Sequence, residues 1–344
     1  MKQLSLMLKP ASSTCNMACG YCFYADEGKR RNVANYGIMT QETAAAVISS
    51  VFCDLSDGDK IVFAFQGGEP TIAGLSFYEY FISEVEKQTV KAAVSYALQT
   101  NGILADETWC EFFKRHNFLV GLSLDGYMEL HNSNRTTIGG VGTFSRVMKA
   151  KKLLDKYAVD YNILAVLTNA MARHPQKVWN FIANVGVRYI QFIPCLDELG
   201  PRNFYNFYSA IFPLWKRHKS YVSVKLFEDI IDMFIYGRAT ACGLNGQCQP
   251  QFVVEADGGV YPCDFYALDE FKLGNLTKDS LRQTFESQVS KEFRAKRAVA
   301  RICEKCRYRP SCNGGCKRQF FAICGHDKDF CGYSMLLDEI LPQL

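Results

Sequence analysis

The sequence predicts an α/β fold in which parallel βα units fill about the first 195 residues and a cysteine-rich part follows. Apolar, β-rich runs alternate there with longer helical runs. Polar and glycine-containing motifs directly follow several of the β-rich runs, and most of the 15 cysteines gather in three short stretches. Such alternation is typical of βαβ units, arranged either as a doubly wound sheet or as an incomplete barrel.

Six strands are expected in the alternating part. They are residues 4–8, 61–66, 94–100, 118–124, 161–168 and 189–194. Helices are expected between them. Residues 40–52 begin with a capping threonine at Thr40, and residues 106–116 begin with Asp106.

The alternation stops near residue 196. An aromatic-rich helix (LFEDIIDMFIYG) and a hairpin candidate (FVVEADGGVYPCDFY) follow, with ADGG as the turn. A boundary at about 235–241 would divide the chain into domains 1–235 and 236–344.

Composition excludes several classes of protein. The 344 residues are 48% apolar and 22% charged with a net charge of +4, which argues against a dedicated nucleic-acid binder. No apolar run approaches the ~20 residues that span a bilayer. The apolar part of MKQLSLMLKP is too short for a signal peptide, so a cytoplasmic protein without a membrane partner is expected.

The cysteines cluster at 15–22, 242–263 and 303–331. In a reducing cytosol, clustered thiols indicate metal binding rather than disulfides. The isolated Cys53, Cys110 and Cys195 are expected to be small buried apolar residues.

The stretch SSTCNMACGYCF spaces its thiols as C-x3-C-x2-C. Three thiolates can hold three irons of a cubane cluster and leave the fourth iron open to a ligand. A zinc site with a fourth ligand elsewhere is the alternative. The motifs QGGEP (66–70), QTNG (99–102) and SLDG (123–126) follow predicted strands, at the edge where parallel α/β folds bind ligands.

The later cysteines include eight thiols, enough for two closed four-cysteine clusters or for two zinc sites. They are Cys242, Cys248, Cys263, Cys303, Cys306, Cys312, Cys316 and Cys331.

CNMACGYCF after the first strand, together with GGEP after the second, resembles the radical S-adenosylmethionine superfamily. The resemblance implies a partial (β/α)6 TIM-like barrel and a 4Fe–4S cluster on Cys15, Cys19 and Cys22. It also implies S-adenosylmethionine on the unique iron, cleaved by one electron to methionine and a 5′-deoxyadenosyl radical.

The same resemblance implies cofactor contacts at the strand ends. Gly68 and Glu69 would meet the methionine amino group, and Arg135 would pair with the carboxylate. The remaining contacts are Ser123, Leu196 against the adenine, and the backbone of Tyr21. Taken singly, a Gly-Gly pair is often only a turn, and an arginine in a polar loop is usually a solvated charge.

The cysteine-rich half resembles the SPASM domain of peptide-modifying radical enzymes. The resemblance implies one auxiliary 4Fe–4S cluster on Cys242, Cys248, Cys263 and Cys316. It implies a second on Cys303, Cys306, Cys312 and Cys331, three clusters in all. Cys324 is left over as a non-ligand, although an exchange of roles with Cys331 is open.

Nearly the whole chain, including FAFQGGEPT, FLVGLSLDG and YPCDFYALDEFKLGN, resembles the anaerobic sulfatase-maturating enzymes. That family oxidises a cysteine or serine of a sulfatase, within C/S-x-P-x-R, to Cα-formylglycine. The radical would take a Cβ hydrogen, Asp264 would act as the base, and the auxiliary clusters would accept the second electron. A turn or cap aspartate is the alternative for Asp264.

Further expectations accompany this resemblance. A flavodoxin- or ferredoxin-type protein would be the reductant. The side chains expected to shape the peptide groove are Gln66, Tyr24, Phe265 and Tyr266.

Two rival functions are open. One is another SPASM enzyme that forms thioether or carbon–carbon crosslinks. The first strand begins at about residue 4, which leaves no room for the N-terminal peptide-binding domain that many such enzymes carry. The other is a non-catalytic iron–sulfur electron carrier, against which the open three-cysteine loop and GGEP argue.

Overall fold

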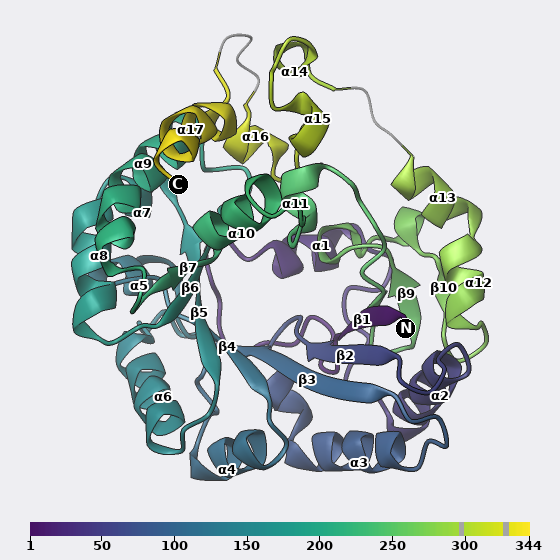
Figure 1. Ribbon diagram of the computed structural model, residues 1–344. Helices are drawn as coiled ribbons and strands as arrows, with labels where there is room; N and C mark the ends of the chain where they lie inside the picture. Colours follow the sequence, from purple (N-terminus) through teal and green to yellow (C-terminus); the bar gives the residue numbers. More distant parts are fainter. Residues whose placement is uncertain (296–298, 326–329) are drawn as a thin grey trace. The chain divides into compact units, whose positions relative to one another are not determined.

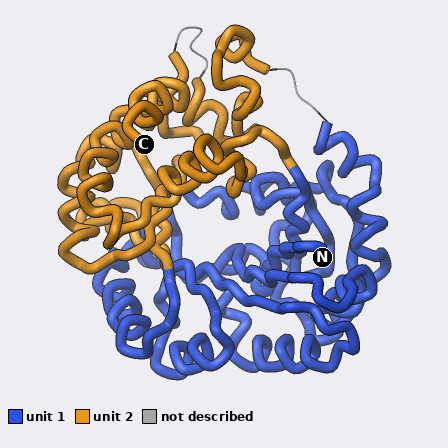
Figure 2. The backbone as a smooth tube through the Cα atoms, in the orientation of Figure 1, with its two compact units in different colours: residues 1–122, 135–161, 249–295 blue, residues 123–134, 162–248, 296–344 orange. Residues whose placement is uncertain are grey.

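The computed structural model describes residues 1–295, 299–325 and 330–344. It divides into two compact units (Figure 2). Unit 1 comprises residues 1–122, 135–161 and 249–295, and unit 2 comprises residues 123–134, 162–248 and 296–344. Each unit is made of three separate stretches of the chain. The predicted division into domains 1–235 and 236–344 stays a prediction.

Unit 1 is built around a sheet with the strand order β10-β9-β8-β1-β2-β3-β4. β1 to β4 are parallel, and β8 pairs parallel with β1. β8, β9 and β10 pair antiparallel, which confirms the hairpin at ADGG. The strands are β1 (Gln3–Leu8), β2 (Lys60–Phe65), β3 (Ala93–Thr100), β4 (Leu119–Ser123), β8 (Val253–Val254), β9 (Gly259–Tyr261) and β10 (Gly274–Asn275).

Helices cover the strands of unit 1 on the outside (Figure 1). Phe65 is almost fully buried in β2, and its ring contacts Tyr78 and Phe81 of α3 with centroids 5.0 and 5.1 Å apart. The helices of unit 1 are α1 (Phe23–Arg30), α2 (Gln41–Phe52), α3 (Leu75–Glu86), α4 (Glu107–Arg115), α6 (Phe144–Lys156), α12 (Leu281–Glu286) and α13 (Gln288–Arg294).

Both predicted helix caps are confirmed. The Thr40 side chain accepts a hydrogen bond from the Thr43 backbone N–H at the start of α2. Asp106 accepts one from the Trp109 N–H at the start of α4. These bonds satisfy N–H groups that have no partner within the helix.

Unit 2 has the parallel strands β5 (Tyr161–Leu167), β6 (Tyr189–Pro194) and β7 (Ser223–Val224) in that order. Its aromatic core lies on α9 (Pro201–His218), which packs against α17 (Gly332–Ile340). The other helices of unit 2 are α5 (Met128–Asn134), α7 (Asn169–Ala172), α8 (Pro175–Asn184), α10 (Lys225–Phe234), α11 (Cys242–Asn245), α14 (Arg301–Glu304), α15 (Arg309–Cys312) and α16 (Phe320–Ile323).

The six predicted strands are confirmed to within about one residue at each end. The expectation for the isolated cysteines is right for Cys110 and Cys195, which are buried, and wrong for Cys53, which is exposed. Cys53 follows Phe52, the last residue of α2, where the chain leaves the buried face of the helix. Within the described residues, no helix has both the length and the apolarity needed to cross a membrane.

Candidate active site

The loop after β1 carries the first three predicted cluster ligands, Cys15, Cys19 and Cys22, all partly exposed. The Met17 N–H donates to the Cys15 Sγ at 3.4 Å, and the Cys22 N–H donates to the Cys19 carbonyl at 3.2 Å. Burial is the main cause that raises the pKa of Cys15, and the nearby Cys22 thiol adds to it. The Cys15 and Cys22 thiols therefore lie near enough to interact electrostatically, and this loop carries the three donors that a shared cluster would use.

The QGGEP loop after β2 lies directly against this cysteine loop. The Glu69 N–H donates to the Thr14 carbonyl at 2.8 Å. Gly68 has φ +54°, and a Cβ at Gly68 would lie 2.2 Å from the Thr14 carbonyl oxygen. Only glycine permits both this conformation and this approach.

We expect Gly68→Ala to displace the cysteine loop, because the clash involves backbone rather than a movable side chain. The variant should lose iron from the N-terminal site after anaerobic reconstitution. Gly74→Ala is the matched control, since Gly74 also has positive φ but a Cβ there would meet nothing within 4 Å. Equal iron content in the two variants would contradict the prediction.

Glu69 is buried, and both of its carboxylate oxygens accept hydrogen bonds from protein donors. Thr100 Oγ1 donates to Oε1 at 2.8 Å, and the Asn101 N–H donates to Oε2 at 2.7 Å. The Asn101 side chain in turn donates to Asn16 Oδ1 at 2.8 Å, beside Cys15. Glu69 thus connects the ends of β2 and β3 to the cysteine loop, and its contact with a cofactor stays a prediction.

Tyr21 and Arg135 lie together in unit 1. The Arg135 guanidinium lies 5.5 Å from the centre of the Tyr21 ring, and Arg135 is only 7% exposed. The Ala18 N–H donates to the Thr136 carbonyl, which holds this segment to the cysteine loop. Arg135 is therefore not the solvated charge that a polar loop usually carries.

The other predicted cofactor contacts, Ser123 and Leu196, belong to unit 2. Ser123 is buried at the end of β4, and Leu196 is partly exposed just after β6. Asp125 of the same SLDG motif accepts from the Val166 N–H at 2.9 Å, which ties the motif to β5. Ser123 is the last residue of β4 and Leu196 lies two residues after β6, so both are at strand ends as predicted, and their roles stay predictions.

Asp264 is buried and held by two donors. Tyr24 Oη and Gln66 Nε2 donate to its Oδ2 at 2.6 and 2.9 Å. Its other oxygen, Oδ1, is buried without a hydrogen-bond partner among the described residues. Burial raises the pKa of Asp264 to about 6, while the charge of Lys9 opposes that rise. An ordinary turn aspartate would instead bond to nearby backbone N–H groups.

Of the four side chains predicted to shape the peptide groove, two contact Asp264 and two pack on other aromatic rings. Tyr24 and Gln66 contact Asp264 directly. Phe265 packs on Phe23 at 5.0 Å, and Tyr266 packs on Phe271 at 5.0 Å.

A buried ionic cluster that the sequence analysis missed lies beside Asp264. Lys9 Nζ is 2.6 Å from Glu255 Oε1, and Arg31 pairs with the same oxygen. The Lys9 ammonium also lies 4.9 Å from the centre of the Tyr24 ring. Burial raises the pKa of Glu27 to about 8. The available signal was the position of Lys9 directly after a strand, like that of QGGEP.

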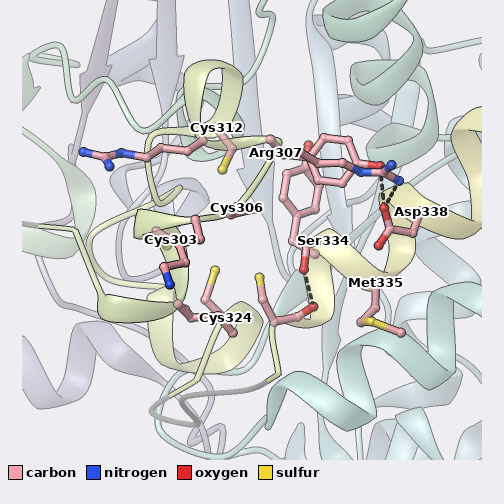
Figure 3. A pocket seen from close by; sticks show the side chains of 14 residues that line it. Cys303, Cys306, Arg307, Cys312, Cys324, Ser334, Met335 and Asp338 are labelled. Atoms are coloured by element: carbon pink, nitrogen blue, oxygen red, sulfur yellow. Dashed lines mark hydrogen bonds and ion pairs between the residues drawn. The ribbon is translucent and has the colours of Figure 1, made fainter.

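In unit 2, five thiols line a cavity of about 360 Å³ (Figure 3), called the thiol cavity below. They are Cys303, Cys306, Cys312, Cys324 and Cys331. Four are the ligands predicted for the second auxiliary cluster, so a cluster fits the donors that the cavity presents. Among the described residues, no three His, Cys, Asp or Glu side chains are close enough to hold a single metal ion.

Cys242, Cys248 and Cys316, predicted for the first auxiliary cluster, also come together in unit 2. Burial raises the pKa of Cys242 to about 11, with smaller contributions from the Cys316 and Cys248 thiols. Gly246, between Cys242 and Cys248, lets the chain there approach the backbone of Cys312, since a Cβ at Gly246 would lie 2.6 Å from the Cys312 carbonyl oxygen. Cys263 belongs to unit 1, next to Asp264, and its place in this ligand set stays a prediction.

Cys324 lies beside Cys331, and the interaction between the two thiols lowers the pKa of Cys331 to about 6. We expect Cys331→Ala to lose about one cluster of iron after reconstitution, because four thiols are needed to close the site. Cys324→Ala should retain the iron. Measured iron per chain, with the visible spectrum as a second readout, checks this, and the reverse result would exchange the two roles.

Two family matches agree with this geometry. Residues 10–174 match the family described as the radical SAM superfamily, and residues 242–307 match SPASM, an iron–sulfur cluster-binding domain. These two domains imply 4Fe–4S clusters and S-adenosylmethionine as cofactors. The first match contains the cysteine loop and QGGEP, and the second contains five of the predicted auxiliary ligands.

Relatives that are similar over nearly the whole chain indicate a more specific family than the two domain matches do. A cysteine-type anaerobic sulfatase-maturating enzyme from Clostridium perfringens is 41% identical over 92% of this chain and 90% of its own length. The serine-type anaerobic sulfatase-maturating enzyme from Klebsiella aerogenes is 29% identical over 98% of this chain and 85% of its own length.

Solved structures agree with these relatives. The structure described as native anSMEcpe with bound AdoMet and Cp18Cys peptide matches with a TM-score of 0.89 at 37% identity, over 99% of this chain and 97% of that one. The predicted α/β class with a parallel sheet and a C-terminal SPASM domain is thereby confirmed. The chain belongs to the anaerobic sulfatase-maturating enzymes of the radical S-adenosylmethionine superfamily.

Proposed function

We propose that this enzyme oxidises a cysteine side chain of a sulfatase, within a C-x-P-x-R sequence, to Cα-formylglycine. The observation that carries the proposal is the buried Asp264, which has one oxygen held by Tyr24 and Gln66 and the other unbonded among the described residues. Asp264 lies in unit 1 with the cysteine loop. The relatives named cysteine-type are more similar than those named serine-type, which favours cysteine as the target.

The bound groups would supply a 5′-deoxyadenosyl radical that removes one hydrogen atom from the substrate Cβ, and an acceptor for one electron. Cys15, Cys19 and Cys22 would hold the N-terminal cluster. Gly68, Glu69, Arg135, Tyr21, Ser123 and Leu196 would hold S-adenosylmethionine. The other eight predicted cysteines would hold two auxiliary clusters.

Asp264 would accept the substrate thiol proton on Oδ1, while Tyr24 and Gln66 keep Oδ2 in place. The substrate CH2–SH group thus loses a hydrogen atom, a proton and an electron to become a thioaldehyde. Water then replaces sulfur to give the aldehyde and hydrogen sulfide. A positioned general base contributes typically 10²–10⁴-fold to such a step.

The test combines the anaerobically reconstituted enzyme with dithionite, S-adenosylmethionine and a sulfatase peptide containing C-x-P-x-R. Conversion of CH2SH to CHO should be seen by peptide mass, coupled to formation of 5′-deoxyadenosine. A matched peptide with serine in place of the cysteine tests the target residue. 5′-Deoxyadenosine without peptide change would remove the sulfatase assignment for that sequence and leave the radical chemistry.

A further inference from the structure

Glu27 is a buried carboxyl that the proposed mechanism leaves without a role. It lies on α1 and is 4% exposed. Neither of its oxygens has a partner within hydrogen-bonding geometry among the described residues. A buried carboxyl of this kind keeps its proton, because the charged form is costly away from water. Burial raises the pKa of Glu27 to about 8, against the opposing charges of Lys9 and Arg31 and the Ala267 N–H.

α1 places Glu27 in the same polar cluster as Asp264. Tyr24 and Glu27 are three positions apart and so share one face of the helix. Tyr24 Oη donates to Asp264 Oδ2 at 2.6 Å, and the Asp264 charge helps to raise the pKa of Glu27. Asp264 Oδ1 is also buried without a partner among the described residues. Ordered water commonly bridges such buried polar atoms, and water can carry a proton between two carboxyls.

The charges of this cluster balance only if its carboxyls share one proton. The cations are Lys9 and Arg31, and the carboxyls are those of Glu27, Glu255 and Asp264. Burial alone would raise the pKa of Glu255, but the charges of Lys9 and Arg31 lower it below its usual value. The shared proton therefore resides on Glu27 rather than on Glu255.

Proton uptake by Asp264 would change this balance. The negative charge of Asp264 disappears, and with it one of the causes that raise the pKa of Glu27. Glu27 then releases its own proton more readily. Solvent is near, because Asp26 and Lys29 on the same helix are exposed.

We propose that Glu27 is the proton-relay residue that returns Asp264 to its ionised form after each turnover. The inference rests on the proposed function, in which Asp264 takes the substrate thiol proton. The Glu27 proton leaves to solvent, and the proton on Asp264 then moves to Glu27. One proton thus passes from substrate to solvent, the cluster regains its starting charge, and no electron moves. Glu27 acts through Asp264 and is a positioning residue for the proton rather than a catalytic one.

The test compares the first turnover with later ones, in the reconstituted enzyme with dithionite, S-adenosylmethionine and excess C-x-P-x-R peptide. Glu27→Gln keeps the size and the neutral form of the side chain but cannot relay a proton. Its first equivalent of formylglycine peptide should form at the wild-type rate, because Asp264 starts ionised. Later turnovers should slow by at least about tenfold, because each must wait for Asp264 to lose its proton unaided.

Two further variants control for structural effects. Glu27→Asp retains a carboxyl and should recover most of the later turnovers. Asp26→Asn removes an exposed carboxyl from the same helix and should match wild type in every turnover. A first turnover that is slowed in Glu27→Gln would indicate a displaced Asp264 and overturn the relay.

A second measurement uses the unaltered enzyme, in case the Glu27→Gln variant loses iron. Infrared spectroscopy should show the C=O stretch of a protonated carboxyl at neutral pH, lost as the pH rises through about 8. Isotopic labelling of glutamate alone assigns that band to a glutamate. Absence of a glutamate that titrates in this range overturns the proposal.

The two proposals fail in different ways. Wild-type turnover throughout in Glu27→Gln removes the relay and leaves Asp264 as the base. No conversion of the peptide by the unaltered enzyme removes the proposed function, and the relay with it.

Discussion

Replacing Asp264 with Asn is expected to slow formylglycine formation by about 10²–10⁴-fold, the usual contribution of a positioned general base. The amide keeps an oxygen that can accept from Tyr24 and Gln66, so the local packing is retained. It cannot take up the thiol proton. Peptide mass against time, for wild type and variant with equal iron content, measures the effect.

The same assay separates catalysis from assembly. Asp264→Asn should still bind S-adenosylmethionine and form 5′-deoxyadenosine, because the cysteine loop is unchanged. Asp269→Asn is the matched control: this carboxylate lies five residues away and accepts only from the Asn32 N–H among the described hydrogen bonds. A fully active Asp264→Asn enzyme would remove the base assignment.

Replacing Lys9 with Met is expected to lower the free energy of unfolding by about 3 kcal/mol, the scale seen when one partner of a buried ion pair is removed. Lys9 is 1% exposed, and its partner Glu255 is fully buried. Methionine approximates the volume of the lysine stem but leaves Glu255 with Arg31 alone. The shift in the urea denaturation midpoint measures the loss.

Lys156→Met provides the comparison, since Lys156 pairs with Glu107 at 2.7 Å but both side chains are about 60% exposed. Surface pairs contribute little, so this variant should unfold at the wild-type urea concentration. Equal midpoints for Lys9→Met and wild type would show that the buried cluster does not stabilise unit 1.

The strands, the helix starts and the cysteine loop could be predicted from the sequence because each depends on residues that are close together in the chain. Period-two and period-3.6 apolar patterns located the strands to within about one residue, and Thr40 and Asp106 marked helix starts through bonds only three residues long. The three-cysteine spacing likewise reports on a single loop. These signals need no knowledge of the remainder of the chain.

The sequence by itself determined the fold class and the strand-end motifs, and its resemblance to a family grouped four of the five cysteines of the thiol cavity, leaving out Cys324. Only the tertiary structure decided that Tyr24 and Gln66, 240 and 198 positions away, hold Asp264. It alone showed that Lys9, Arg31 and Glu255 form one buried cluster, and that Cys53 is exposed. The physical reason is that burial and pairing of a charged side chain depend on which distant segments pack around it, and no local pattern records that.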